Sequence, residues 1–110
     1  MNYRISFNSD FELHFKKLSK KYKSLILDLS KLVESLRNEP EQGVPLGSNL
    51  FKIRLKIVSK GKGKSGGARI ITYLIHQEKE IYFIAIYDKS EIENLSKQQL
   101  KTLLIEAGLA

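Results

Sequence analysis

The segment from Gly66 to Leu95 limits the possible folds more than any other part of the chain. It contains two long apolar stretches on either side of a polar turn, Gln77–Glu80. β-Branched and aromatic residues dominate both stretches, which is typical of β-strands. Because neither stretch alternates between apolar and polar residues, we expect both faces of this hairpin to be covered. The segment therefore predicts two antiparallel strands in the middle of a sheet.

A cation stands at each open end of this hairpin, since Arg69 begins the first stretch and Lys89 follows the second. A hairpin brings its open ends together, so these two side chains are expected to lie close to each other. Gly66 and Gly67 precede Arg69 and would let the backbone approach a ligand closely. This end of the hairpin is the first candidate for a functional site.

Charge and composition narrow the class of partner. The chain has 110 residues and a net charge of +7, which fits one basic domain over residues 1–110. Such a domain favours an anionic partner, most simply nucleic acid, although lysines that only keep a domain soluble would give the same charge. The absence of cysteine excludes disulfides and thiolate chemistry. No apolar run has membrane-spanning length and the N-terminus lacks a signal peptide, so we expect a cytoplasmic protein without membrane contact.

The N-terminal part predicts a strand followed by two helices. Residues 3–7 alternate like a short strand, and Ser9 with Glu12 forms a capping box that predicts a helix start. That helix is expected to end or bend around residues 20–23, and a second helix stops before Pro40. The apolar stripe of the second helix consists of Leu25, Leu29, Leu32, Val33 and Leu36.

The remaining segments complete the predicted order of elements. Residues 39–49 contain two prolines and two glycines, which predicts a loop. Residues 51–57 alternate strictly between apolar and basic side chains and predict a strand. Ser96 with Gln99 predicts a capped C-terminal helix. The order β-α-α-β-β-β-α indicates an α+β domain with a mainly antiparallel sheet, an N-terminal helical hairpin packed on it and a C-terminal helix.

Lys52, Arg54 and Lys56 share one face of the strand predicted over residues 51–57. Three cations on one face repel one another unless an anion binds there, although a solvated outer face would also tolerate them. If this strand lies beside the hairpin, its cations join Arg69 and Lys89 in one groove that can hold phosphates. This combination favours a site for an RNA or DNA backbone.

Other side chains are weaker candidates. Lys62 and Lys64 lie in a glycine-rich loop and are predicted to contact RNA phosphates, with a plain linker as the alternative. Tyr87 is either a core aromatic residue or presents its hydroxyl beside the hairpin cations. His14 and His76 have no third histidine or acidic cluster near them in the sequence, so no metal site and no cofactor are predicted.

Four stretches in the second half of the chain resemble the RelE/ParE superfamily of toxins from type II toxin–antitoxin pairs. They are PLGSNLFKIR, LFKIRLKI, GGARIITYL and IYFIAIYDKSEIENLS. The resemblance covers residues 43–104 and is nearest to the HigB-type toxins. It implies a ribosome-dependent endoribonuclease that cuts mRNA in the decoding site and so inhibits translation. It also implies a co-encoded cognate antitoxin with a helix-turn-helix, and contact with operator DNA only through the antitoxin complex.

The resemblance also implies which residues act. It assigns the catalytic site to the strand cations, which are Lys52, Arg54, Arg69 and Lys89. Some members of the superfamily have a catalytic tyrosine shortly after the last of these cations, where this chain has Leu95. Tyr87 is the candidate that replaces it, from the other side of Lys89.

The implied reaction needs neither a metal nor a cofactor. RNA breaks when a 2′-OH attacks the adjacent phosphate, so the protein must activate that hydroxyl and stabilise additional negative charge. Arginine stays charged and suits the phosphate. Neighbouring cations favour the neutral form of Lys52, which makes this residue a candidate base.

Two other functions compete with RNA cleavage. One is a ParE-like toxin that inhibits DNA gyrase, but members of that branch generally lack the full set of strand cations. The other is a non-catalytic module that binds RNA or the ribosome, because binding and cleavage of phosphates require similar cations. Mapping of mRNA ends after brief expression would separate these functions.

Overall fold

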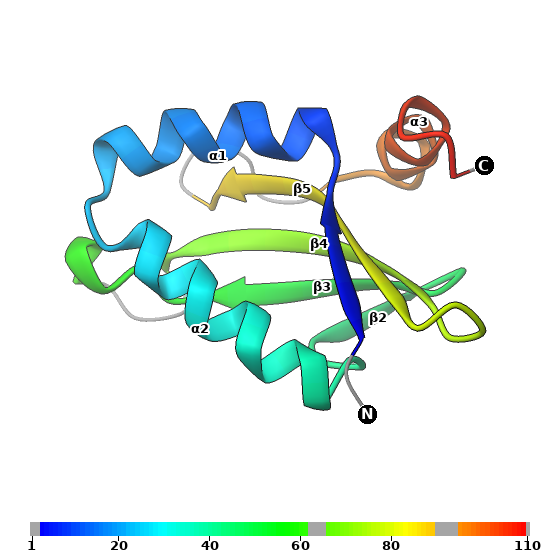
Figure 1. Ribbon diagram of the computed structural model, residues 1–110. Helices are drawn as coiled ribbons and strands as arrows, with labels where there is room; N and C mark the ends of the chain where they lie inside the picture. Colours follow the sequence, from blue (N-terminus) through cyan, green and yellow to red (C-terminus); the bar gives the residue numbers. More distant parts are fainter. Residues whose placement is uncertain (1–2, 62–65, 90–94, 110) are drawn as a thin grey trace.

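The computed structural model describes residues 3–61, 66–89 and 95–109, which form an α+β fold (Figure 1). The strands are β1 (Arg4–Phe7), β2 (Val44–Gly47), β3 (Leu50–Leu55), β4 (Ala68–Ile75) and β5 (Glu80–Asp88). The helices are α1 (Ser9–Lys21), α2 (Leu25–Asn38) and α3 (Lys97–Glu106), with a short 3-10 helix, η1 (Val58–Lys60), after β3. The strand order is β1-β5-β4-β3-β2, and only β1 and β5 pair in parallel. The predicted fold class is confirmed.

The predicted hairpin forms the middle of the sheet. β4 and β5 pair with each other along their full lengths and are flanked by β3 and β1. Buried apolar residues lie on both faces of this pair, as expected. The predicted turn was one residue too late: Glu80 already belongs to β5, and its carboxylate pairs with Arg4 of β1 at 2.9 Å. This ion pair draws Glu80 into the sheet.

The predicted loop over residues 39–49 contains an additional strand, β2. It pairs with the first half of β3, so that Val44 lies opposite Lys52 and Pro45 opposite Phe51. A proline is tolerated here because β2 is an edge strand whose outer side needs no pairing. Composition alone suggested a loop, whereas the strand forms through pairing with β3 across the turn at residues 48–49.

α1 and α2 cover one face of the sheet as a helical hairpin (Figure 1). Leu29, Leu32 and Leu36 of the α2 stripe are buried in the core formed with β3, β4 and β5, which confirms their prediction. The predicted capping box at the start of α1 is wrong by one residue. The cap is Asn8, whose side-chain oxygen accepts a hydrogen bond from the Phe11 amide at 2.8 Å.

α3 packs on the opposite face of the sheet. The capping box of Ser96 and Gln99 is present as predicted. Leu100 and Leu104 contact a second apolar cluster with Ile71 and Ala85 of the central strands. Within the described ranges, no helix is both long and apolar enough to cross a membrane.

Gly67 is required for close packing of β4 against β3. A Cβ atom added at this position would lie 2.0 Å from the Leu55 carbonyl oxygen and 3.2 Å from the Ile57 amide nitrogen. The close backbone approach expected before Arg69 is therefore made to the neighbouring strand, which fixes where β4 begins.

Candidate active site

Three predicted site residues form a row across three adjacent strands. Arg54 of β3 lies opposite Arg69 of β4, and Arg69 lies opposite Tyr87 of β5. Residues that lie opposite each other in antiparallel strands point to the same face, and neighbouring strands are about 4.8 Å apart. The three side chains therefore belong to one site on the sheet face that also carries α3.

A β-bulge in β5 places Tyr87 in this row. Counted from the hairpin turn, the pairs run in step as far as Thr72 and Phe83, but the next pair is Ile71 with Ala85, so Ile84 is the extra residue. If the pairing continued past Thr72 and Phe83 without a bulge, Arg69 would face Ile86, and Tyr87 would point to the face covered by α1 and α2. The bulge therefore moves the tyrosine hydroxyl to the face of the arginines.

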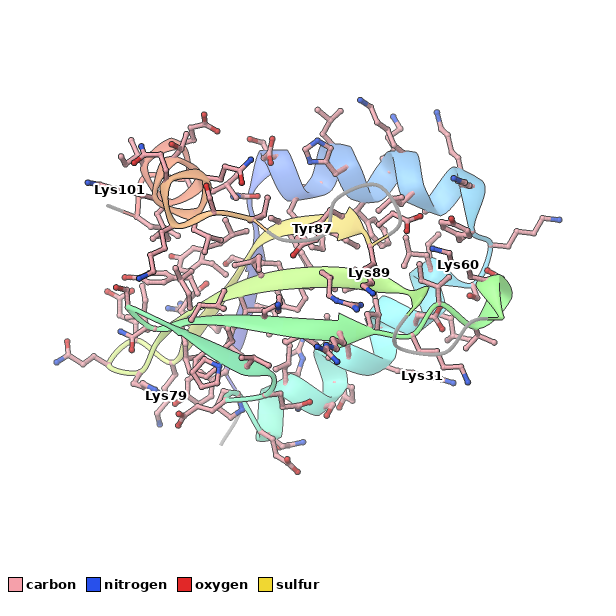
Figure 2. The ribbon with its side chains drawn as sticks, turned by 180° about the vertical axis from the view of Figure 1, so that it is seen from behind. Lys31, Lys60, Lys79, Tyr87, Lys89 and Lys101 are labelled. Atoms are coloured by element: carbon pink, nitrogen blue, oxygen red, sulfur yellow. The ribbon has the colours of Figure 1, made fainter. Side chains whose placement is uncertain are left out.

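Lys52 and Lys89 extend the same site. Lys52 precedes Arg54 by two residues, so both side chains lie on the same face of β3, where Arg54 is exposed and Lys52 half-buried. Lys89 follows Tyr87 by two residues, is exposed, and its amide donates to the Gly67 carbonyl at 3.2 Å. Figure 2 views this side of the sheet with Tyr87 and Lys89 labelled. The structure thus brings together all the residues predicted to be catalytic.

Arg69 lies deepest among the site cations. Its side chain is buried, with 3% of the residue exposed, and it donates a hydrogen bond to the Ala68 carbonyl at 3.2 Å. Burial lowers the pKa of the Arg69 guanidinium, and the positive charge of Arg54 lowers it further. Because arginine nevertheless stays protonated in proteins, this position favours an anion that offsets both costs.

The hydroxyl of Tyr87 is buried and has no hydrogen-bond partner among the described residues. Burial raises the pKa of this phenol, while the charge of Arg69 acts in the opposite direction. The hydroxyl is therefore protonated at neutral pH. It can donate a hydrogen bond or a proton to a ligand bound beside Arg69. A tyrosine with only a structural role would not need a hydroxyl at this position.

We expect Tyr87→Phe to separate function from stability. Because the hydroxyl lacks a partner among the described residues, its loss should leave the free energy of unfolding unchanged or raise it, by about 1 kcal/mol at most. Any activity of the site that uses this hydroxyl as a proton donor should fall about a hundredfold.

Alkaline unfolding offers a second measurement on the same variant. The raised pKa of Tyr87 stabilises the fold below the usual tyrosine value of about 10, and this contribution is lost as the pH rises through the folded-state pKa. In Tyr87→Phe, the free energy of unfolding should therefore decrease less at alkaline pH than it does in the wild type. A variant that is both fully active and clearly less stable would show that the hydroxyl serves the fold.

Asp88 anchors the end of β5 and was missed in the sequence. Its buried carboxylate accepts hydrogen bonds from the Lys60 ammonium group at 2.7 Å and from the Tyr22 hydroxyl at 2.8 Å. Burial lowers the pKa of Lys60, but the hydrogen bond and charge of Asp88 outweigh this effect and raise it. The carboxylate thus ties Tyr87 and Lys89, its neighbours in the chain, to η1 and to the end of α1. The sequence offered one sign of this anchoring role, because Asp88 is an acidic residue between two predicted site residues.

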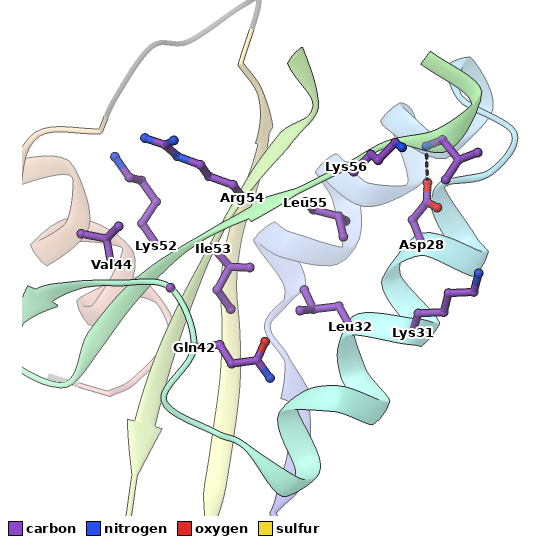
Figure 3. A pocket seen from close by; sticks show the side chains of 12 residues that line it. Asp28, Lys31, Leu32, Gln42, Val44, Lys52, Ile53, Arg54, Leu55 and Lys56 are labelled. Atoms are coloured by element: carbon purple, nitrogen blue, oxygen red, sulfur yellow. Dashed lines mark hydrogen bonds between the residues drawn. The ribbon is translucent and has the colours of Figure 1, made fainter. Parts of the chain in front are cut away.

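A cavity of about 650 Å³ lies on the side of β3 that faces away from β4. Figure 3 shows Ile53 and Leu55 pointing toward Leu32 of α2, whereas Lys52 and Arg54 point away from that helix. The cavity is lined by the three predicted strand cations, Lys52, Arg54 and Lys56, together with residues of α2 and β2. Lys56 is exposed here, beyond the end of β3, rather than in the row of Arg54 and Arg69.

The remaining predicted residues lie elsewhere. Lys62 and Lys64 fall outside the described residues. His14 on α1 lies 3.5 Å from Asp10, while His76 at the hairpin turn is hydrogen-bonded to Tyr3 at 3.1 Å. In the part of the chain that the structure describes, no group of three or more histidine, aspartate or glutamate residues could hold a metal ion.

The chain matches the model of one protein family, described as the RelE toxin of the RelE/RelB toxin–antitoxin system, over residues 11–109. It belongs to this family of toxins. The family matched is RelE, and the nearer resemblance to HigB-type toxins stays a prediction.

Solved structures of toxins have the same fold. A mutant of the Escherichia coli toxin RelE in the free state matches with a TM-score of 0.62 and 18% identity, over 98% of this chain and 96% of that chain. The toxin–antitoxin complex RelBE2 from Mycobacterium tuberculosis matches with a TM-score of 0.57 and 12% identity, over 80% and 99%. The intact E. coli RelBE complex matches with a TM-score of 0.51 and 21% identity, over 78% and 95%.

Leu95 and Tyr87 lie near the same cavity. Leu95 lies beside the α3 cluster and lines a cavity of about 340 Å³ together with Tyr87. A side chain at either position therefore reaches the same space.

Proposed function

We propose that this toxin is a ribosome-dependent endoribonuclease that cuts mRNA without a metal ion and thereby inhibits translation. The observation that carries the proposal is the row of Arg54, Arg69 and Tyr87 on one sheet face, with Lys52 and Lys89 beside it. A buried arginine whose pKa is lowered, next to a second arginine, favours a bound phosphate. The neighbouring protonated phenol supplies a proton donor at the same place.

The reaction follows from these positions. The 2′-oxygen of one nucleotide forms a bond to the adjacent phosphorus while the bond from phosphorus to the 5′-oxygen breaks. Lys52 accepts the proton of the 2′-OH, and Tyr87 donates a proton to the departing 5′-oxygen. Arg54 and Arg69 stabilise the negative charge that grows on the five-coordinate phosphate, and Lys89 adds a further positive charge. The products are a 2′,3′-cyclic phosphate and a 5′-hydroxyl.

Dependence on the ribosome has a physical reason. The cations of the candidate site can bind a phosphate but do not by themselves align the 2′-oxygen, phosphorus and 5′-oxygen. Holding reacting groups in such an alignment is worth about 7–11 kcal/mol of the barrier. The ribosome holds mRNA in a fixed conformation in its decoding site and can supply this alignment.

We therefore expect isolated RNA to be cut slowly and ribosome-bound mRNA rapidly. The test compares cleavage of one mRNA by the purified toxin, with and without programmed ribosomes, followed by primer extension. Arg54→Ala serves as the inactive control. Equally fast cleavage of isolated RNA would contradict the proposed role of the ribosome.

The same assay tests metal independence. A chelator should leave cleavage unchanged when the ribosomes are kept intact by a polyamine, which a translation control monitors. Loss of cleavage with intact ribosomes would show that the reaction uses a metal ion.

The proposed partners are mRNA on the ribosome and a cognate antitoxin in the cytoplasm. Two of the three structures described above are toxin–antitoxin complexes, which supports an antitoxin partner for this chain as well. We expect that antitoxin to be co-encoded, to carry a helix-turn-helix and to mediate any contact with operator DNA. Co-purification of the two co-expressed proteins, and loss of toxicity on co-expression, would test this assignment.

A further inference from the structure

α1 lies along the part of β5 that extends beyond β1. β1 pairs only with Glu80–Phe83 of β5, and α1 runs beside the remainder of that strand (Figure 1). A groove of about 410 Å³ lies between α1 and the end of β5. Its lining residues are His14, Lys17, Leu18 and Lys21 from α1 and Ile86, Tyr87 and Asp88 from β5.

The α1 side of this groove is basic. Lys17 and Lys21 are both exposed and are four residues apart, so they lie on the same side of the helix. The carboxylate in the groove, Asp88, is hydrogen-bonded to Lys60 and Tyr22. These bonds hold the carboxylate in the protein interior and offset its charge, so it does not cancel the field of the two lysines.

Tyr87 connects this groove to the candidate active site. It lines the groove and is also the last member of the row with Arg54 and Arg69. A second hollow reaches Tyr87 from the α3 side, but it is lined by the acidic residues Asp10 and Glu106. An anionic strand that passes Tyr87 is therefore attracted toward Lys17 and Lys21 and repelled on the α3 side.

We infer that the groove between α1 and β5 binds the backbone of single-stranded RNA, with Lys17 and Lys21 contacting phosphates next to the one held by Arg54 and Arg69. This inference rests on the proposed function, because it concerns the same RNA strand. The inference defines the path of the bound RNA. The RNA crosses the sheet from β3 to β5 and continues along the C-terminal half of α1. The two lysines position the RNA and take no part in the chemistry.

The same helix provides a matched control. Lys16 and Lys20 are also exposed, and they too are four residues apart, but they are not among the residues that line the groove. Lys17→Ala/Lys21→Ala and Lys16→Ala/Lys20→Ala therefore remove the same charge from the same helix. Only the Lys17→Ala/Lys21→Ala pair should weaken the binding of RNA that lies in the groove.

The experiment measures binding of a short, fluorescently labelled 2′-O-methyl RNA, which cannot be cut, at a series of salt concentrations. Each phosphate contact to a single strand contributes about 0.7 to the slope of log K against log salt concentration. The groove variant should reduce the magnitude of this slope by about 1.4, because two contacts are lost. The control pair should leave the slope near the wild-type value. Equal effects of the two pairs, or no effect of the groove pair, would overturn the inference.

Arg54→Ala/Arg69→Ala in the same assay separates this inference from the proposed function. If the arginine variant lowers the slope and the groove variant does not, only the groove assignment is wrong. If the groove variant lowers the slope but the wild-type toxin cuts no ribosome-bound mRNA, the groove binds RNA and the proposed enzymatic function is wrong. Thermal unfolding of each variant checks that the fold is kept.

Discussion

Replacing Arg69 with alanine should abolish growth arrest and ribosomal mRNA cleavage while the domain stays folded. The guanidinium can bind two phosphate oxygens at once, and their charge grows as the phosphate becomes five-coordinate. Loss of one such contact typically costs about 2.7–4 kcal/mol of transition-state stabilisation, or roughly a hundred- to a thousandfold in rate. Arg69→Lys should recover only part of the activity, because lysine offers a point charge without the planar guanidinium.

The effect of this substitution on stability should be small for an electrostatic reason. Burial and the charge of Arg54 lower the pKa of Arg69, so its charged side chain opposes folding at neutral pH. Removing the charge relieves that cost and offsets the lost packing. We expect a change of roughly 1 kcal/mol or less in the free energy of unfolding.

Thermal and urea unfolding, measured beside toxicity, check this prediction. Arg37→Ala is the matched control, because Arg37 is a partly buried arginine on α2, on the opposite face of the sheet. It should remain toxic. An Arg69→Ala protein that is unfolded would show that the arginine serves the fold, and one that is fully toxic would place the site elsewhere.

Leu32→Ala should have the largest effect on stability, a loss of about 2–5 kcal/mol in the free energy of unfolding. Leu32 belongs to the buried stripe of α2, and its side chain points toward β3, where Ile53 and Leu55 face it (Figure 3). Truncation leaves a cavity between helix and sheet that the surrounding side chains cannot fill completely.

Leu27→Ala on the same helix is the control for this change. Leu27 is 58% exposed, so the same truncation should cost less than about 0.5 kcal/mol. Urea unfolding curves of the two variants give the comparison. A loss below about 0.5 kcal/mol for Leu32→Ala would show that α2 does not pack on the sheet as described.

The main elements could be predicted because their patterns are local. The α2 stripe, the alternation of β3 and the capping box of α3 each depend on residues within one element, and the structure confirms all three. β2 was missed because it is stabilised by pairing with β3, while its Pro45 and flanking glycines are typical of a loop. The start of α1 was displaced by one residue because Asn8 and Ser9 are both good capping residues, and only Asn8 makes the hydrogen bond.

The candidate site could be selected from the sequence as a set of residues, but its geometry could not be predicted. The alternation of β3 and the ends of the hairpin were enough to select Lys52, Arg54, Arg69 and Lys89. The sequence contains no signal for the bulge at Ile84, and a hairpin without it would have Tyr87 on the other face. The anchoring of Asp88 depends on Lys60 and Tyr22, which come from distant parts of the chain.

The most direct test of RNA cleavage as the function is to map mRNA 5′ ends in cells after brief expression of the wild-type toxin and of Arg69→Ala. The proposed mechanism predicts new 5′ ends within coding regions of translated mRNAs, in phase with codons, for the wild type alone. DNA damage without new mRNA ends would instead indicate a gyrase inhibitor. Growth arrest with neither change would indicate a module that binds RNA or the ribosome without cutting, and either outcome would contradict the enzymatic function proposed for the row of Arg54, Arg69 and Tyr87.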